Sequence, residues 1–258
     1  MRQAIRALGW ATNIFWAILL FFTITSVYSA LQIRPGFGEP YTTASGNSII
    51  ASIPFYISNG GFYDLTNLNV TTQIKDNIGN PISDSSTFIA TIPHGRNVTG
   101  AHDMAISMEN ITSNRLSHLL FNDSVLNVDI ALKLDYANAV PFQISTNFTM
   151  PWGAPLNNLT VSNISAAPYN MTHARITVLV SFENHSYLGL NGAMRLELVN
   201  FFNQVVGSGS TNINVPSRSG YGGSIEVLSS SNVANVREAR LYFQTSVLTY
   251  GPVVISLV

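Results

Sequence analysis

The chain contains no cysteine among its 258 residues. Disulfides, thiolate metal sites, cysteine nucleophiles and iron–sulfur clusters are therefore excluded, and each folded unit must be held together by its apolar core. Charged residues are also scarce, at 10%, against about 25% in an ordinary soluble domain. Lys and Arg (12) nearly balance Asp and Glu (13), and no basic run provides the electrostatic footprint of a nucleic-acid-binding protein.

Motifs of common enzymes are missing as well. The sequence has no H-E-x-x-H, no G-x-S-x-G and no glycine-rich phosphate loop. His94 and His102 bracket a predicted loop and would form a metal site only if a carboxylate such as Asp103 joined them. Two exposed loop histidines are the simpler interpretation. We predict a non-enzymatic protein without catalytic residues, metal ligands or a bound cofactor.

One apolar segment without charge marks the start of the chain. No Asp, Glu, Lys or Arg lies between Arg6 and Arg34, and Trp10–Val27 approaches one bilayer crossing at about 1.5 Å per helical residue. Arg2 and Arg6 precede this run, so the positive-inside rule places the N-terminus in the cytoplasm. We predict a single transmembrane helix within residues 1–30, with membrane lipid as its partner and the C-terminal domains outside the cell.

Two other interpretations of this segment stay open. A removable signal peptide would be cut at the small residues near Ser29–Ala30. A prepilin-like leader would be cut after the basic and small residues at Arg6-Ala7-Leu8. All three interpretations place the remainder of the chain outside the membrane.

That remainder is rich in acceptor sequences for N-linked sugars. Such N-x-S/T sequences indicate surface positions in an exported protein, and we predict N-linked glycans as covalent partners. The nine predicted acceptors are Asn69, Asn97, Asn110, Asn122, Asn147, Asn158, Asn163, Asn170 and Asn184. Many acceptors in a chain without cysteine are a combination typical of archaeal surface proteins.

Past the apolar start, the sequence predicts two copies of one all-β domain. Ser52–Asn59 and Thr177–Asn184 both alternate apolar and polar residues, end on Asn, and precede small residues and a Tyr. Further alternating runs separated by Gly, Pro and Asn follow each in the same order, as in an antiparallel Ig-like sandwich. The predicted divisions are a linker at 31–47, a first sandwich at 48–150, a Pro-rich linker at 151–157 and a second sandwich at 158–258.

Two local features complete the prediction. Residues 108–121 place Met108, Ile111, Leu116, Leu119 and Leu120 on one face of a helix, with a shorter counterpart at residues 232–237. Asp76–Asn80 resembles an oxygen-rich calcium loop only faintly, and a hairpin turn explains its Asn and Gly residues better.

The repeated pattern resembles the type 2 late-embryogenesis-abundant (WHy) domain family. The strands that end in Asn59 and Asn184, the alternating strand after each, and the glycine-containing turn carry the resemblance. The family's usual Asn-Pro-Asn is replaced by Asn59-Gly-Gly61 and by Asn184-His-Ser186. The resemblance implies a small Ig-like sandwich with a short helix and no enzymatic activity.

These features favour a membrane-anchored, glycosylated structural or interaction protein at the cell surface. Its expected partner is another cell-surface or membrane protein, either a surface layer or a larger complex in which the chain is an accessory subunit; no nucleic acid is expected. Two alternatives remain: a pilin-like subunit of an extracellular filament, and a surface module that binds a solute or carbohydrate through its loops.

Overall fold

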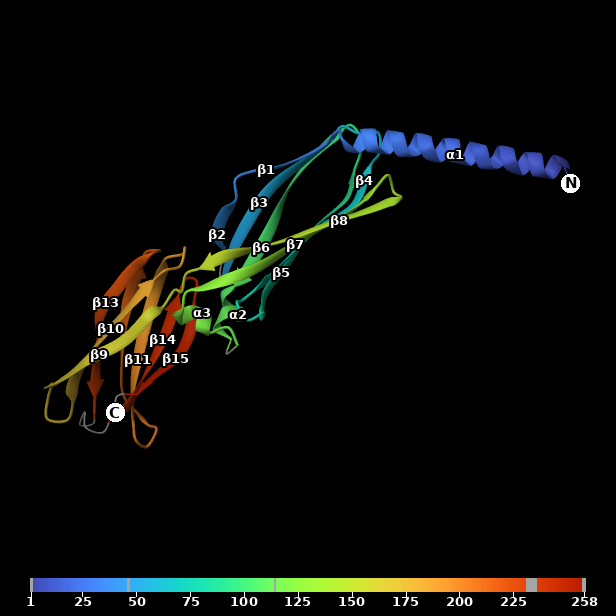
Figure 1. The fold of residues 1–258 in the computed structure, drawn as a ribbon. Coiled ribbons are helices and arrows are strands. Elements are labelled where there is room, and N and C mark those ends of the chain that lie inside the picture. Colours follow the sequence, from blue (N-terminus) through green and yellow to red (C-terminus); the bar gives the residue numbers. More distant parts are fainter. Residues whose placement is uncertain (1, 46, 114, 231–235, 257–258) are drawn as a thin grey trace.

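Strands dominate the computed structural model, which describes residues 2–45, 47–113, 115–230 and 236–256. A long helix, α1 (Arg2–Ala30), begins the chain, and two short helices, α2 (Met108–Thr112) and α3 (His118–Phe121), lie near its middle (Figure 1). The first half contains β1 (Ile33–Phe37), β2 (Tyr41–Ser45), β3 (Ser48–Asn59), β4 (Leu65–Lys75), β5 (Pro81–Ile92), β6 (Arg96–Ser107), β7 (Ser124–Tyr136) and β8 (Val140–Trp152). The second half contains β9 (Asn157–Pro168), β10 (Ala174–Asn184), β11 (Leu190–Asn200), β12 (Val205–Val215), β13 (Ser219–Ser229), β14 (Val236–Thr245) and β15 (Thr249–Ser256).

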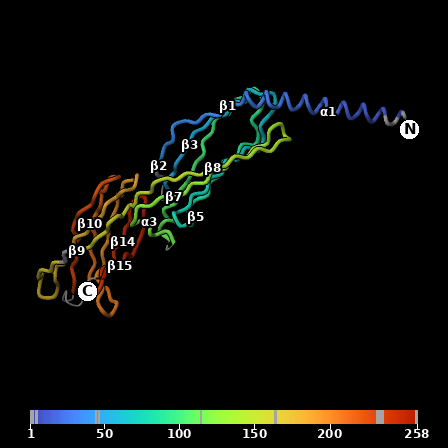
Figure 2. Tube along the Cα trace, in the orientation of Figure 1, coloured from blue at the N-terminus to red at the C-terminus, as the bar shows by residue number. Residues whose placement is uncertain are grey.

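The helix α1 projects from one end of an elongated body, and the C-terminus lies near the opposite end (Figures 1 and 2). Its segment Arg6–Ala30 has a hydropathy of 1.8, and 0% of that apolar window is buried inside the structure. By length and composition it is able to cross a membrane, as a membrane anchor or a signal sequence does.

Strand pairing gives both halves the same topology. In the first half, β3 lies between β6 and the successive strands β1 and β2, and a second sheet has the order β5-β4-β7-β8. The second half repeats this as β9-β10-β13 and β12-β11-β14-β15, and among the described residues β12 and β13 pair through Gly207–Ser208. All the pairs are antiparallel. The predicted all-β fold with two tandem antiparallel sandwiches is therefore confirmed.

Two predicted segments differ from the structure. Residues 31–47, expected as a linker, form β1 and β2, which pair with the two ends of β3. The single helix expected at residues 108–121 is wrong: α2 ends at Thr112, and Ser113 is extended at φ −63° and ψ 150°. The Ser113 hydroxyl donates to Asn110 O at 2.6 Å and so competes with the helical hydrogen bond. The predicted second-copy helix covers residues 232–235, outside the described part, while Val236 and Arg237 begin β14.

The core extends across the boundary between the sandwiches. One buried cluster contains the end of the first sandwich that lies away from α1 and the whole second sandwich. Residues between β6 and β9 connect the two parts of this cluster. The predicted apolar face of residues 108–121 belongs to it, since all five of its members are buried. A second, smaller cluster lies at the end of the first sandwich next to α1: Phe55, Ile57, Leu65, Leu68, Ile92 and Tyr136.

A polar layer separates the two clusters. Along β4, Thr72 lies between Leu68 of the small cluster and Ile74 of the large one. The His102 ring is buried there, with Nε2 2.8 Å from Thr72 Oγ1 and Nδ1 2.9 Å from Thr87 Oγ1. The expectation of an exposed loop histidine at this position is wrong. Desolvation lowers the pKa of His102, partly offset by Asp103, so the ring is held neutral.

Each sandwich contains the same buried asparagine. Asn59 Nδ2 donates to Tyr63 O at 2.9 Å and to Ile92 O at 3.1 Å. Asn184 Nδ2 donates to Leu188 O at 2.8 Å and to Pro216 O at 3.0 Å. Both amides connect the end of one sheet to a strand of the other, and this explains why the sequence repeat is most visible there.

We expect Asn59→Ala and Asn184→Ala each to lower the free energy of unfolding by about 2 kcal/mol or more, because two buried carbonyls lose their donor. Chemical denaturation monitored by circular dichroism measures the change. The matched control is Asn97→Ala, at an exposed position on β6. Equal midpoints for all three variants would contradict the assigned role.

Candidate functional site

The first candidate site is the junction between α1 and the first sandwich. Thr25 Oγ1 lies 2.7 Å from Tyr63 Oη, and Tyr136 Oη donates to the Ser26 carbonyl at 3.0 Å. Ser29 is buried, and its Oγ accepts the Phe62 N–H at 2.7 Å. The last two turns of the helix are thus tied to the loop after β3 and to the end of β7.

Aromatic rings surround this junction. Tyr63 makes edge contacts with Phe22 at 5.6 Å and with Tyr136 at 5.9 Å. Tyr28 stacks on Phe62 at 5.7 Å between ring centroids, and both rings remain more than half exposed. Rings with an apolar body and a polar tip at the end of an apolar helix suit a membrane–water interface.

The second candidate site is the junction between the sandwiches, where residues 153–156 connect β8 to β9. Leu156 N donates to Leu120 O of the first sandwich at 2.8 Å, and His185 N of the second donates to Ala154 O at 2.9 Å. The approach is so close that a Cβ added to Gly153 would lie 2.1 Å from the His185 carbonyl oxygen. Residues 154–156 of this segment are buried, so they act as part of the core.

A histidine between two carboxylates closes this junction. His185 Nδ1 lies 2.7 Å from Asp123 Oδ2, and Nε2 lies 2.9 Å from Glu183 Oε2. Hydrogen bonds that the ring makes to Asp123 and, next, to Glu183 raise the pKa of His185. Burial opposes ionisation of Asp123, but the Ala154 N–H and the His185 ring outweigh it and lower the pKa of that carboxyl. The contact between Asp123 and His185 connects the first sandwich to the second.

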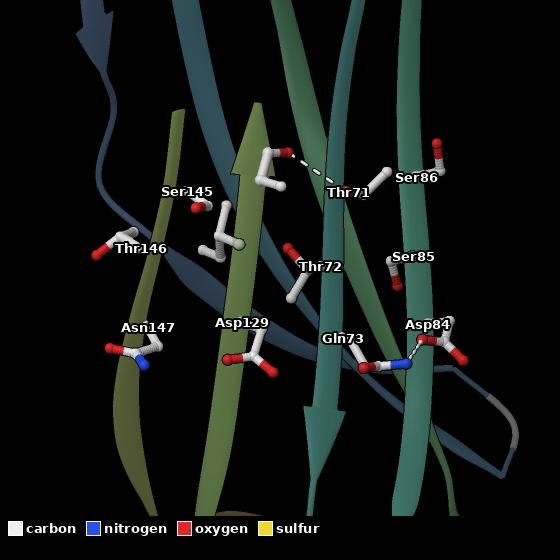
Figure 3. A pocket seen from close by; sticks show the side chains of 12 residues that line it. Thr71, Thr72, Gln73, Asp84, Ser85, Ser86, Asp129, Ser145, Thr146 and Asn147 are labelled. Carbon is white, nitrogen blue, oxygen red and sulfur yellow. Dashed lines mark hydrogen bonds between the residues drawn. The ribbon is translucent and has the colours of Figure 1, made fainter. Parts of the chain in front are cut away.

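The third candidate site is a shallow groove of about 880 Å³ on the outer face of the β5-β4-β7-β8 sheet (Figure 3). It offers hydroxyl, amide and carboxylate groups, and Gln73 Nε2 donates to Asp84 Oδ1 at 2.9 Å within it. Lys75 pairs with Asp129 at 3.1 Å on the same sheet. These groups suit hydrogen bonding to a polar surface or a sugar. Asn147, one of the predicted glycan acceptors, lines the groove from the edge strand β8.

The predicted acceptor asparagines occupy different environments. Asn69 is half buried, and its Oδ1 accepts from Ser86 Oγ at 2.8 Å. Asn163 belongs to β9, and its side chain lies outside the described part. The exposed acceptors are Asn97, Asn110, Asn122, Asn147, Asn158 and Asn170. Six of the nine are thus open to a sugar.

Asn184 requires a correction. Its side chain is 0% exposed, and its nitrogen donates to two backbone carbonyls. A sugar on that nitrogen would replace one of these hydrogen bonds and has no room in the folded chain. The sequence Asn184-His-Ser186 has a structural explanation instead, because Ser186 Oγ donates to Asn184 Oδ1 at 2.6 Å.

The histidines and the calcium-like loop serve the fold. His94 Nδ1 lies 2.9 Å from Asp64 Oδ1, whereas Asp103 accepts from Ser52 Oγ at 2.6 Å. His102 is buried elsewhere, and in the part of the chain that the structure describes no group of three His, Cys, Asp or Glu residues is arranged for a metal. Asp76 accepts the Ile78 and Asn80 N–H groups, as expected for a turn.

Comparisons with known proteins add no family. No family model and no curated protein matches the chain. Among solved structures, red sea bream transglutaminase is similar over 87% of this chain and 31% of its own, at 14% identity and TM-score 0.31. The periplasmic chaperone SfaE is similar over 85% of this chain and 96% of its own, at 11% identity and TM-score 0.27. The chain spans about a third of the transglutaminase, and the resemblance to the WHy family stays a prediction.

The pH dependence of the second junction follows from His185. A pKa raised above about 6.5 stabilises the folded chain fully below that pH, and this contribution is lost as the pH rises through the folded value. We expect His185→Gln to remove about 0.5–1 kcal/mol at pH 5.5, a value limited by solvent screening, and much less at pH 8.5.

Thermal melts at the two pH values measure this difference. The control is His173→Gln in the exposed turn before β10, and His102 contributes equally to every variant. A His185→Gln penalty that is the same at both pH values would contradict the ionic role.

Proposed function

We propose that this chain is a non-enzymatic, membrane-anchored and N-glycosylated extracellular protein that supports or spaces another component of the cell surface. The observation that carries the proposal is mechanical continuity. An exposed apolar helix is hydrogen-bonded to the first sandwich, and that sandwich shares one buried core with the second. In such a body, the orientation of α1 in the membrane fixes the orientation of the second sandwich at the far end.

The distribution of charge and apolar surface supports this proposal. Arg2 and Arg6 lie at the N-terminal end of α1, which favours a cytoplasmic N-terminus. The aromatic rings around Tyr63 lie at the opposite end of the helix, where an outer interface is expected. Partners in keeping with the proposal are a surface layer or a larger membrane complex.

The binding alternative has one supporting feature, the polar groove on the outer sheet face. The filament alternative has the exposed helix α1, which would pack on neighbouring helices after cleavage at Ala7-Leu8. Membrane topology and processing separate the three possibilities, and the absence of cysteine makes the experiment simple because each introduced thiol is unique.

The test uses Gln3→Cys at the start of α1 and Asn212→Cys on β12, both at exposed positions. Intact cells are treated with a membrane-impermeant maleimide. We expect labelling of Asn212→Cys at once and of Gln3→Cys only after permeabilisation. Labelling of Gln3→Cys on intact cells would contradict the orientation, and loss of residue 3 from the mature chain would favour the cleaved alternatives.

Rigidity of the second junction is tested by a distance measurement. Spin labels at Ala90→Cys on β5 and Asn212→Cys on β12 report the separation of the two sandwiches. We expect one narrow distance distribution, which Gly153→Ala broadens or shifts because the added Cβ meets the His185 carbonyl. Gly222→Ala is the control, since a Cβ there meets nothing within 4 Å. A broad distribution in the parent chain would contradict the rigid spacer.

A further inference from the structure

The edge strand β8 is unusually open. Every side chain from Val140 to Thr149 is exposed, and β7 is its only paired neighbour within the described residues. The exposed apolar members on one face are Val140, Phe142, Ile144 and Phe148, at 44%, 49%, 57% and 45%. Their partners on β7 include Leu134 and Val128, so this row continues the inner face of the sheet beyond its covered part.

Most of the ordinary protection of sheet edges is missing on β8. The strand pairs with β7 over 13 residues without a register shift. No Asp, Glu, Lys or Arg occurs between Asp135 and Arg175. Natural edges are usually blunted by charges, bulges or short length, because free N–H and C=O groups recruit other strands. Prolines occur only near the ends, at Pro141 and Pro151.

The other edge strands do have such protection. Strands β5 and β6 lie next to each other, with Ser83 Oγ donating to Ala105 O, and they contain Asp84 and Asp103. Strands β1 and β2 are five residues each. Strand β9 has two register shifts against β10, and β15 has eight residues and one shift against β14. Strand β8 is therefore the exposed edge that needs another mechanism to prevent pairing with a strand from a different molecule.

A second copy of the chain is the occupant that the β8 sequence fits. Antiparallel pairing centred on Thr146 keeps both prolines outside the paired window. It places Phe142 opposite Met150 and Ile144 opposite Phe148 on one face, in each half of the twofold arrangement. In this register apolar side chains lie opposite apolar side chains on one face, and no charge opposes another.

Asn147 lies at this edge. It pairs with Asp129 on the outer face (Figure 3), and in the twofold arrangement it would lie opposite Ser145 of the second copy. Opposed Cβ atoms in antiparallel strands are about 5 Å apart, and a sugar is bulkier than that space. We propose that the N-linked glycan at Asn147 covers β8 and prevents two copies from pairing along it.

This inference rests on the glycosylation in the proposed function, and its test is independent of membrane orientation. Thr149→Ala removes the acceptor sequence while keeping Asn147. Thr99→Ala does the same for Asn97 on β6 and is the matched control. The full chain is purified in detergent from its glycosylating host. Peptide mapping gives occupancy, and light scattering after size exclusion gives the protein mass.

We expect the parent chain and Thr99→Ala to be monomeric and Thr149→Ala to show about twice the protein mass. Adding Ile144→Lys to Thr149→Ala should restore the monomer, because each copy would place a charge in the paired strand. Enzymatic removal of sugars from the parent chain should reproduce the dimer without any substitution. A monomeric Thr149→Ala, a dimer of Thr99→Ala, or a bare Asn147 in the monomeric parent chain would overturn the inference.

Discussion

The structure depends on the short backbone segment between Trp152 and Asn157, because it is packed as core. Trp152 Nε1 donates to Leu119 O at 2.8 Å, and Leu156 is fully buried beside the helices of the first sandwich. His185 of the second sandwich donates to the same segment. Without these contacts the molecule would be two small domains on a tether, and each would bury a smaller fraction of its surface than the joined body does.

Sequence and structure agree best where a polar group is buried. Asn59 and Asn184 make equivalent hydrogen bonds, and the turns after β4 and β11 are closed by Asp76 and Asn200 in the same way, through backbone N–H groups two and four residues later. Apolar strand positions tolerate exchange among Val, Ile, Leu and Phe, so they conserve only an alternation. The alternation of apolar residues therefore reveals the repeat, and a few amide and carboxylate side chains with equivalent hydrogen bonds show which positions of the two copies correspond.

The fold class, the tandem arrangement and the apolar helix were predictable because each leaves a periodic signal in the sequence. The edge strands at residues 33–45 were not, because Pro35, Gly36, Gly38 and Pro40 indicate a linker until β3 is present to pair with them. The contact between Asp123 and His185 at the junction between the sandwiches was also not predicted. The two residues are far apart in sequence and meet only after both sandwiches form. A buried role for Asn184 could have been inferred from its equivalence to Asn59, which has no acceptor sequence.

Amide hydrogen exchange at Leu156 and His185 tests the shared core most directly. The Leu156 N–H bonds the connecting segment to the first sandwich, and the His185 N–H bonds the second sandwich to the same segment. If the sandwiches form one body, these amides exchange as slowly as that of Leu196 in the centre of β11, through global unfolding alone. Exchange of Leu156 and His185 at the rate of exposed turns, with Leu196 still protected, would show two independent domains and contradict the shared core.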